Sequence, residues 1–252
     1  MGMPEIVLHQ FGPFPGVDSG SPFCTKVHRA LAFKGLAYRP KNAASPGAIK
    51  KINPRGKLPV LALDGRLIPD SSAIFRALDE LQPEPRLYPE DVATRARVKL
   101  LEDWADESLY WFAVHQRWGV DENFKLLAKE FTFIPTALRW LVPPMIRRGV
   151  VKSLFAQGIG RLTQSEVLEQ LEKHLDMLVG LLGDGPFFVG EAPTAADFAI
   201  FGPLQAMRQD MTPEARQRVE ARSALVDWMR RVDVIAHSEH TAKVVCRHPD
   251  SR

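Results

Sequence analysis

Two side chains that could do chemistry lie three positions apart in the stretch SGSPFCTKVHRAL, residues 19–31: the hydroxyl of Ser21 and the thiol of Cys24. Apolar residues recur at helical spacing from residue 27 onward, which predicts that a helix begins here. Ser21 suits its N-cap, and Pro22 suits the first helical position, where an amide N–H would have no partner within the helix. The exposed N–H groups and the positive end of the helix dipole act mainly over the first turn, which favours Ser21 for holding an anion.

The same residues also have a purely structural interpretation, in which Ser21 caps the helix and Cys24 is a small buried thiol. Cys24 lies one turn inside the helix, where burial would raise its pKa rather than lower it. The other cysteine of the chain, Cys246, is far away in sequence, so Cys24 has no cysteine partner nearby. Cys24 is therefore the second candidate for sulfur chemistry, behind Ser21.

The composition is that of an ordinary globular protein: of 252 residues, 45% are hydrophobic and 25% are charged. Such a chain can bury a core in one or two domains. Two cysteines give neither a disulfide framework nor paired metal ligands, and they indicate a reducing compartment. The N-terminal residues lack a signal-peptide pattern and no window of 18 residues is uninterruptedly apolar, so we expect a cytoplasmic protein.

The net charge of +3 is unevenly distributed along the chain. No acidic residue occurs between Glu130 and Glu166, and the five basic residues of this interval leave a net charge of −2 for the rest. Nucleic-acid binding would require a denser basic stripe, so we expect no nucleic-acid partner. The five basic residues are Arg139, Arg147, Arg148, Lys152 and Arg161.

The first 80 or so residues have the signals of an α+β domain. The pair Asp64-Gly65 between two apolar runs predicts a β-hairpin with a two-residue turn. Apolar residues at helical spacing after residue 71 predict a helix that packs by one face. The expected order is a strand at 5–11, the helix after Ser21, a strand near 37–39, a short irregular or helical piece, strands at 59–63 and 66–68, and a helix at 71–81.

Beyond residue 82 the strand signals vanish and the rest of the chain is predicted to be helical. The proline-rich stretch QPEPRLYPED cannot continue a helix and is expected to be a linker. Thr163 with Glu166 forms a capping-box pattern for a helix that Gly183 ends, and Thr194 with Asp197 forms another. A further helix is predicted at 224–232. From Val92 a helical face is expected to contain Leu101, Trp104, Ser108, Trp111 and His115.

Three motifs together resemble the glutathione S-transferase superfamily. They are the S-x-x-C helix mouth, the approach NPRGKLPVL to a strand with PDSSAI after the hairpin, and the capping box PTAAD. The stretch KLPVL…DSSAI is similar to theta-like members, whereas FGPFPGVDSGSPFC and QGIGRLTQSEV are similar to the failed-axon and metaxin-like branch. The resemblance implies a thioredoxin-like α+β domain at residues 1–82, a linker at 83–91 and an all-α helical bundle at 92–252.

The resemblance also implies a glutathione site. Pro59 corresponds to a cis proline of the family, and the main chain of Leu58 would pair with the cysteinyl backbone of glutathione. Asp70 and Ser71 would bind the charged γ-glutamyl end, and Lys57 would approach the glycine end. Each has a structural alternative: Asp70 and Ser71 as the N-cap and first residue of a helix, and Lys57 as a solvated surface lysine.

The activity implied by the resemblance is transfer of the glutathione thiolate to an apolar electrophile, with Ser21 donating a hydrogen bond to the thiolate. Glutathione would be a substrate, no metal is expected, and the family implies a homodimer. Two alternatives stay open. One is a glutathione-dependent thiol oxidoreductase that forms a mixed disulfide through Cys24, and the other is a non-catalytic interaction module with the same fold.

In the family the electrophile lies between the loop before the first helix and the first long helix of the second domain. Aromatic residues of both segments are therefore candidates to line that pocket, although interhelical packing would explain them equally well. The candidates are Phe11, Phe14, Tyr110, Trp111, His115 and Trp118.

Two further segments have an open role. The basic, apolar stretch 131–161 could be a lid over the electrophile site, a contact with a membrane surface, or ordinary packing with a solvated basic face. Pro135, Pro143 and Pro144 are expected to break it, which disfavours a long membrane anchor. His237, His240, Cys246 and His248 crowd the C-terminus, but their spacing matches no closed zinc pattern, and we expect a polar tail.

Overall fold

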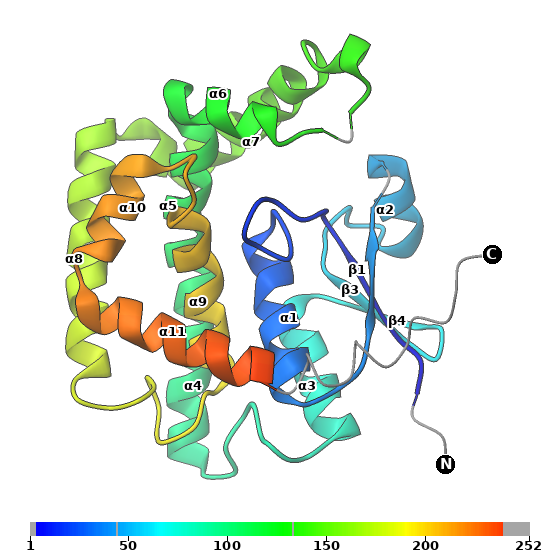
Figure 1. Cartoon of the computed structure of the whole chain (residues 1–252), viewed down its shortest axis with the longest axis vertical. Coiled ribbons are helices and arrows are strands. Elements are labelled where there is room, and N and C mark those ends of the chain that lie inside the picture. The colour runs from blue at the N-terminus through cyan, green and yellow to red at the C-terminus, as the bar shows by residue number, and fades with distance from the viewer. Residues whose placement is uncertain (1–3, 44, 133, 239–252) are drawn as a thin grey trace. The chain divides into compact units, whose positions relative to one another are not determined.

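A computed structural model of the chain describes residues 4–43, 45–132 and 134–238 (Figure 1). The chain divides into two compact units that are not contiguous in sequence. Unit 1 comprises Met1–Glu102, Gly185–Gly202 and Trp228–Arg252, and unit 2 comprises Asp103–Asp184 and Pro203–Asp227. The domain boundaries inferred from the sequence, at 82 and 92, stay a prediction. An α+β part followed by a helical part is the predicted fold class, and the order of elements confirms it.

Unit 1 contains a four-stranded mixed sheet with the strand order β2-β1-β3-β4. β1 (Ile6–Gln10) pairs in parallel with β2 (Arg39–Asn42) and antiparallel with β3 (Val60–Leu63), which pairs antiparallel with β4 (Arg66–Pro69). The second strand was predicted near 37–39 and begins two residues later. Its sequence RPKN is exposed and carries charge and proline, which suits an edge strand and hides the usual β signal.

The helices of the α+β part follow the apolar spacing. α1 (Pro22–Phe33) and α3 (Ser71–Leu81) occupy the predicted positions and pack against each other, and α2 (Pro46–Ile52) is the short piece between β2 and β3 (Figure 1). Asp64 and Gly65 both have positive φ, 48° and 83°, as a two-residue hairpin turn requires.

The proline-rich stretch after α3 contains no helix or strand and is fixed by polar contacts. The Asp79 carboxylate accepts the backbone N–H groups of Leu87 at 2.9 Å and Tyr88 at 3.0 Å. The buried Lys34 ammonium donates to Asp79 at 2.5 Å and to the Gln82 carbonyl at 2.7 Å. These contacts hold the segment against α1 and α3.

A long helical segment follows, in which two π-helical turns interrupt the α-helix. Its parts are α4 (Val92–Trp104), η1 (Ala105–Leu109), α5 (Tyr110–Val114) and η2 (His115–Gly119). The predicted apolar face was wrong except at His115, because Leu101, Trp104, Ser108 and Trp111 are only half-buried. Glu102, a charged residue, belongs to the buried face instead. Each π-helical turn contains more residues than an α-helical turn, so the face that is buried rotates around the helix axis after it. The buried face contains Val98, Glu102, Ala105, Leu109 and Phe112.

The remaining helices are α6 (Asp121–Lys129), α7 (Val142–Gln157), α8 (Gln164–Leu182), α9 (Ala195–Met207), α10 (Pro213–Glu220) and α11 (Ser223–Ser238), with 3-10 turns η3 (Thr136–Leu138) and η4 (Ile159–Arg161). The capping box of Thr163 and Glu166 is confirmed. The stretch 131–161 is broken near its prolines, as predicted: η3 and α7 are separate elements, and Pro143 and Pro144 lie in the first turn of α7, where a proline leaves no hydrogen bond unmade.

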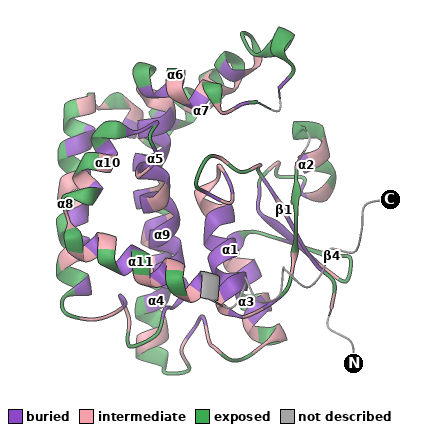
Figure 2. Ribbon diagram, viewed as in Figure 1, coloured by how far each residue is buried: buried purple, intermediate pink, exposed green. Residues whose placement is uncertain are grey.

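At the start of α9 one half of the predicted capping box is present: the Asp197 carboxylate accepts the Thr194 N–H at 2.8 Å. This carboxylate also has other partners. The Asp197 carboxylate accepts from the backbone and hydroxyl of Thr194, from the backbone of Phe188, and from the Trp228 indole at 3.0 Å. Burial raises the pKa of Asp197 although these hydrogen bonds act in the opposite direction. Figure 2 shows α9 buried along most of its length. No helix among the described residues is long and apolar enough to cross a membrane.

Candidate functional site

Ser21 lies directly before α1 with an extended backbone, at φ −102° and ψ 124°, which confirms it as the N-cap. Its hydroxyl makes no capping hydrogen bond, although N-cap serines usually bond an N–H of the first turn. The half-buried oxygen is thus uncommitted to the helix backbone. It can hydrogen-bond a group that approaches the helix N-terminus.

The loop before Ser21 is closed by its own hydrogen bonds. The Gly20 N–H donates to the Gly12 carbonyl at 2.8 Å, and the Ser19 hydroxyl donates to the Phe11 carbonyl at 2.8 Å. A Cβ at Gly20 would lie 2.7 Å from the Phe14 ring, so only glycine lets that ring pack so closely. Of the two predicted wall residues here, Phe14 is half-buried and Phe11 is 44% exposed.

A buried arginine fixes the same loop to α1. Arg29 donates to the Asp18 carboxylate at 2.6 Å and to the Asp233 carboxylate of α11 at 3.0 Å, and its guanidinium lies 5.2 Å from the centre of the Phe201 ring. Sequence reasoning missed this residue, because its partners lie 11 and 204 positions away. Arg29 holds the loop without belonging to the helix mouth itself.

Cys24 is fully buried in an apolar cluster with Ile49, Leu58 and Val60. Burial raises the pKa of its thiol, while the Phe11 backbone and the Ser21 and Ser19 hydroxyls act weakly in the opposite direction. A reactive cysteine needs an accessible thiolate. The environment of Cys24 is therefore that of a packing residue.

Leu58 and Pro59 lie directly before β3, and the peptide bond between them is cis, as the resemblance implied. Among the described residues, neither the N–H nor the carbonyl of Leu58 is hydrogen-bonded. Its side chain is 6% exposed and packs against Cys24. The main chain of Leu58 is thus available to an extended peptide, while its side chain anchors the segment.

Asn53 organises the loop that leads to Leu58, a role that sequence reasoning missed. Its buried side chain donates to the Lys57 carbonyl at 2.8 Å and accepts from the Arg55 N–H at 3.1 Å. Its own carbonyl accepts from Gly56, whose φ of +66° suits glycine. The dipeptide Asn-Pro shortly before a glycine was the available signal. Lys57 itself is exposed.

The start of α3 has the structural roles expected for Asp70 and Ser71. Asp70 is the N-cap, and its carboxylate accepts the Ala73 N–H at 2.9 Å. Its φ is +80°, uncommon for a residue with a side chain, and strained positions of this kind occur often at binding sites. Asp70 is exposed and Ser71 is 3% exposed. The cap leaves the Asp70 carboxylate exposed toward an approaching cation.

A buried ionic network connects α1, α3 and α4, and no sequence pattern predicted it. Lys26 donates to Glu102 at 2.8 Å, and the hydroxyls of Ser72 and Tyr88 donate to the same carboxylate at 2.7 and 2.6 Å. Burial alone would raise the pKa of Glu102, but the Lys26 charge and these hydrogen bonds outweigh it and lower that pKa. The network joins α1, the first turn of α3 and α4.

Gly202 of α9 sets the position of the first turn of α1. A Cβ at Gly202 would lie 2.5 Å from the carbonyl oxygen of Pro22, closer than real contacts allow. Because the obstacle is backbone, no side-chain rotation could relieve it. The helix mouth is thus packed directly on α9.

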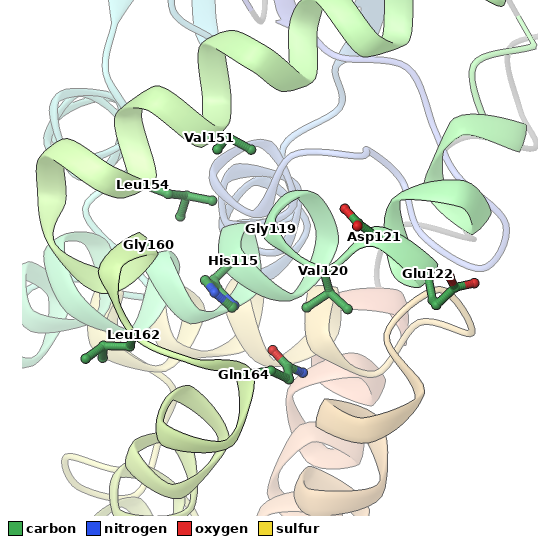
Figure 3. A pocket seen from close by; sticks show the side chains of 10 residues that line it. All are labelled: His115, Gly119, Val120, Asp121, Glu122, Val151, Leu154, Gly160, Leu162 and Gln164. Atoms are coloured by element: carbon green, nitrogen blue, oxygen red, sulfur yellow. The ribbon is translucent and has the colours of Figure 1, made fainter.

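The candidates of unit 2 separate into two groups. The rings of Tyr110 and Trp111 contact each other with centroids 5.4 Å apart, and Trp118 contacts two phenylalanine rings, Phe124 and Phe131, each at 5.9 Å. These three residues are half-buried and pack against other rings. His115 instead lines a cavity of about 440 Å³ within unit 2, and none of the other three lines it (Figure 3).

The predicted glutathione residues all lie in unit 1, and one apolar cluster joins Cys24 of the helix mouth to Leu58. Among the described residues, no group of three or more His, Cys, Asp or Glu side chains could hold a metal ion. His240, Cys246 and His248 lie outside the described residues, as does the side chain of His237.

Comparisons with known proteins agree with this geometry. A model for the glutathione S-transferase N-terminal domain matches residues 18–86, and one for the C-terminal domain matches residues 153–231. The isoprene-epoxide–glutathione S-transferase of Rhodococcus sp. (strain AD45) is 26% identical over 243 residues, which cover 90% of this chain and 97% of the relative. Failed axon connections of Drosophila melanogaster is 28% identical over 228 residues, 82% of this chain and 51% of that protein.

Solved structures share the fold. Glutathione S-transferase III in its apo form superposes with a TM-score of 0.62 at 20% identity, over 98% of this chain and all of the other. A GST-like protein from Pseudomonas syringae superposes with a TM-score of 0.62 at 22% identity, over 98% of this chain and 78% of the other. With two family models matched in order and the predicted fold in place, this chain belongs to the glutathione S-transferase superfamily.

Proposed function

We propose that this protein is a glutathione transferase, which binds glutathione in unit 1 and conjugates its thiolate to a small apolar electrophile. The observation that carries the proposal is the contrast at the mouth of α1. The Ser21 hydroxyl at the N-cap makes no capping hydrogen bond to the helix backbone, whereas Cys24, three residues later, is fully buried. The sulfur that reacts therefore belongs to the ligand.

Each part of glutathione has a counterpart in unit 1. The main chain of Leu58 suits the cysteinyl backbone, because its N–H and carbonyl are unpaired among the described residues. The exposed Asp70 carboxylate suits the ammonium of the γ-glutamyl end. The N–H groups at the start of α3, together with Ser71, suit the neighbouring carboxylate. Lys57, which is exposed, suits the glycine carboxylate.

The proposed reaction is a displacement at carbon by the glutathione sulfur, and it requires no group beyond Ser21, the two substrates and water. The glutathione thiol gives up its proton to solvent, Ser21 donates a hydrogen bond to the thiolate, and the sulfur attacks carbon while the bond to the leaving group breaks. A hundredfold increase in the thiolate fraction corresponds to about 2.8 kcal/mol. A helix N-terminus contributes up to about 2 kcal/mol. A hydrogen bond to a charged acceptor adds about 1.5–3 kcal/mol, so the two together suffice.

Small epoxides are the acceptor class that we propose to test first. The Rhodococcus relative, whose match covers nearly its whole length, is named for an isoprene epoxide. Opening an epoxide forms the carbon–sulfur bond while the carbon–oxygen bond breaks, and the oxygen takes a proton from water. As the family implies, we further propose that the protein acts as a homodimer in the cytoplasm.

Activity of two serine and cysteine variants tests the mechanism. With glutathione and either a small epoxide or a generic aryl halide, Ser21→Ala should lose most of the turnover, about 10- to 100-fold, if its hydrogen bond stabilises the thiolate. Cys24→Ser should retain turnover once corrected for folded protein. The reverse result would contradict the serine mechanism and favour a thiol oxidoreductase that works through Cys24.

An interaction module with this fold is the second candidate, because the chain matches Failed axon connections over nearly as long a stretch as it matches the transferase. Retention on immobilised glutathione separates the two cheaply. Retention with turnover supports the transferase. Absence of both retention and turnover would favour the interaction module.

A further inference from the structure

A cavity within unit 2 has the features of a ligand site that the glutathione chemistry does not use. Its volume is about 440 Å³, within the range of pockets that hold small molecules. The wall comes from η2, the start of α6, α7, the η4 turn and the start of α8 (Figure 3). All of these elements belong to one compact unit, so the cavity does not depend on unit 1.

His115 is the residue of the cavity wall that has a buried polar atom without a hydrogen-bond partner among the described residues. The residue is only 6% exposed, and its fully buried Nδ1 has no hydrogen-bond partner among the described residues. Buried polar groups in proteins are nearly always paired. Burial lowers the pKa of His115, so the ring is neutral at pH 7 and offers one donor and one acceptor.

The backbone around His115 leaves the ring little room to turn away. A Cβ at Gly119 would lie 3.1 Å from its Cδ2 and 3.2 Å from its Nε2, so the glycine backbone packs closely on the imidazole. Gln164, which also lines the cavity, already exchanges hydrogen bonds with Gln116 and donates to Glu214 at 2.6 Å. His115 is therefore the lining group that keeps its hydrogen-bonding capacity.

The rest of the lining indicates what kind of molecule fits. Val120, Val151, Leu154 and Leu162 supply apolar wall. The acidic residues of the lining, at the start of α6, are paired: Asp121 with Arg147 at 2.5 Å and Glu122 with Lys125 at 2.6 Å. The charged residues of the lining are already paired, which disfavours a charged ligand. An apolar molecule with a hydroxyl could pack against the apolar wall and hydrogen-bond the imidazole of His115.

We propose that this cavity binds a small uncharged alcohol or phenol, whose hydroxyl donates a hydrogen bond to the neutral imidazole of His115 while its apolar body contacts the valine and leucine wall. The site is independent of the proposed transferase function, because binding requires no glutathione. It gives the helical unit a recognition role of its own.

Titration with 2-naphthol, without glutathione, tests the proposal through the ligand's fluorescence. The matched probe 2-methoxynaphthalene keeps the rings and the oxygen but lacks the donor. The intact protein should bind 2-naphthol saturably and roughly 3- to 10-fold more tightly than 2-methoxynaphthalene, the range for one hydrogen bond. His115→Phe keeps an aromatic ring and should abolish that preference.

His174→Phe is the matched control. His174 also has a buried Nδ1 without a partner among the described residues, but it packs on Trp104 and Phe112 and does not line the cavity. The His174→Phe variant should bind 2-naphthol and 2-methoxynaphthalene with the same affinities as the intact protein. Val151→Phe should weaken both probes equally, because Val151 is 39% exposed at the wall and a larger side chain would fill the space.

Several results would overturn the proposal. These are absence of saturable 2-naphthol binding, an unchanged preference in folded His115→Phe, or an equal loss in His174→Phe. Tighter binding of 1-naphthylmethylamine than of 2-naphthol would refute the uncharged class. If His115→Phe does not fold, unweakened binding by folded Val151→Phe would be the refuting result. None of these outcomes involves glutathione, so the transferase proposal stands or fails separately.

Discussion

The Asp70 carboxylate caps α3 and is proposed to bind the γ-glutamyl ammonium of glutathione. A single substitution can separate these two roles. Asp70 caps α3 through the Ala73 N–H and remains exposed at a backbone φ of +80°. Asparagine is an equally good N-cap and is one of the few residues that tolerate positive φ. A change to asparagine therefore removes the charge and keeps both the cap and the backbone.

Asp70→Asn should weaken glutathione binding without unfolding the protein. Loss of a hydrogen bond between charged groups corresponds to about 1.5–3 kcal/mol, or roughly 10- to 150-fold in Kd. Isothermal titration with glutathione measures the change, and thermal unfolding checks the fold. Unchanged affinity would show that Asp70 only caps the helix.

Glu102 gives the clearest pH dependence at the residue scale. Its folded pKa lies below the ordinary value, so it stabilises the fold at pH above about 4.3, and this contribution is lost as the pH falls through the folded pKa. Glu102→Gln removes the carboxylate charge that faces the buried Lys26 ammonium and should cost about 3–5 kcal/mol at pH 7. Urea unfolding at pH 7 and pH 3.5 should show the difference from the intact protein shrinking in acid.

The double variant Lys26→Met/Glu102→Gln is the control for that measurement. It removes both charges, so it should be much less destabilised than Glu102→Gln alone. A difference that stays the same at both pH values would mean that the ion pair is not the source of the stability.

At the scale of elements, the helix mouth depends on a helix that begins more than 170 residues later. Gly202 of α9 lies against the Pro22 carbonyl, where a methyl group has no room. Gly202→Ala should destabilise the protein by about 1–3 kcal/mol, as overpacking does, and should lower transferase turnover by displacing Ser21.

Gly180→Ala is the matched control, because that glycine lies in α8 with nothing within 4 Å of the added Cβ. It should stabilise the protein by about 0.8–1 kcal/mol, the difference in helix propensity. Equal effects of the two substitutions, measured by thermal unfolding and turnover, would show that the α9 contact does not set the mouth.

The elements that could be predicted from sequence are those with a local cause. The hairpin at Asp64-Gly65, α1, α3, the capping box of α8 and the contact of Asp197 with the Thr194 N–H follow from turn chemistry, helical spacing and cap residues a few positions apart. Pro143 and Pro144 mark a break for an equally local reason, because proline is unfavourable in a helix interior and favourable in the first turn, where α7 begins.

The candidate site divides in the same way. Ser21 and Asp70 could be placed because an N-cap is a local property. The pairing of Lys26 with Glu102 across 76 positions could not, because no local pattern marks a buried charge. That Glu102 is buried is also why the apolar face of α4 was assigned wrongly.

For the whole molecule, the two units are connected by continuous helices. The boundary between them falls within α4, within α9 and within α11. Unfolding any of these helices removes structure from both units, so we expect one cooperative transition rather than two.

Glutathione should therefore stabilise the whole chain. At 100 times its Kd it should raise the free energy of unfolding by about 2.7 kcal/mol, in one transition. Calorimetry with and without glutathione measures the change, and oxidised dithiothreitol is a control that cannot occupy the peptide site. Two separated transitions, of which only one moves, would contradict the coupling.

The role that we propose for Leu58 depends on its main chain, which makes it insensitive to most substitutions. Its side chain is turned into the core, and what it offers a ligand is a peptide group, which every amino acid except proline possesses in full. Substitution of Leu58 by any residue other than proline would keep that peptide group. Asn53 differs, because its side chain shapes the loop before Leu58 through hydrogen bonds. Substitution of Asn53 is therefore expected to weaken glutathione binding more than substitution of Leu58, although Asn53 need not touch the ligand.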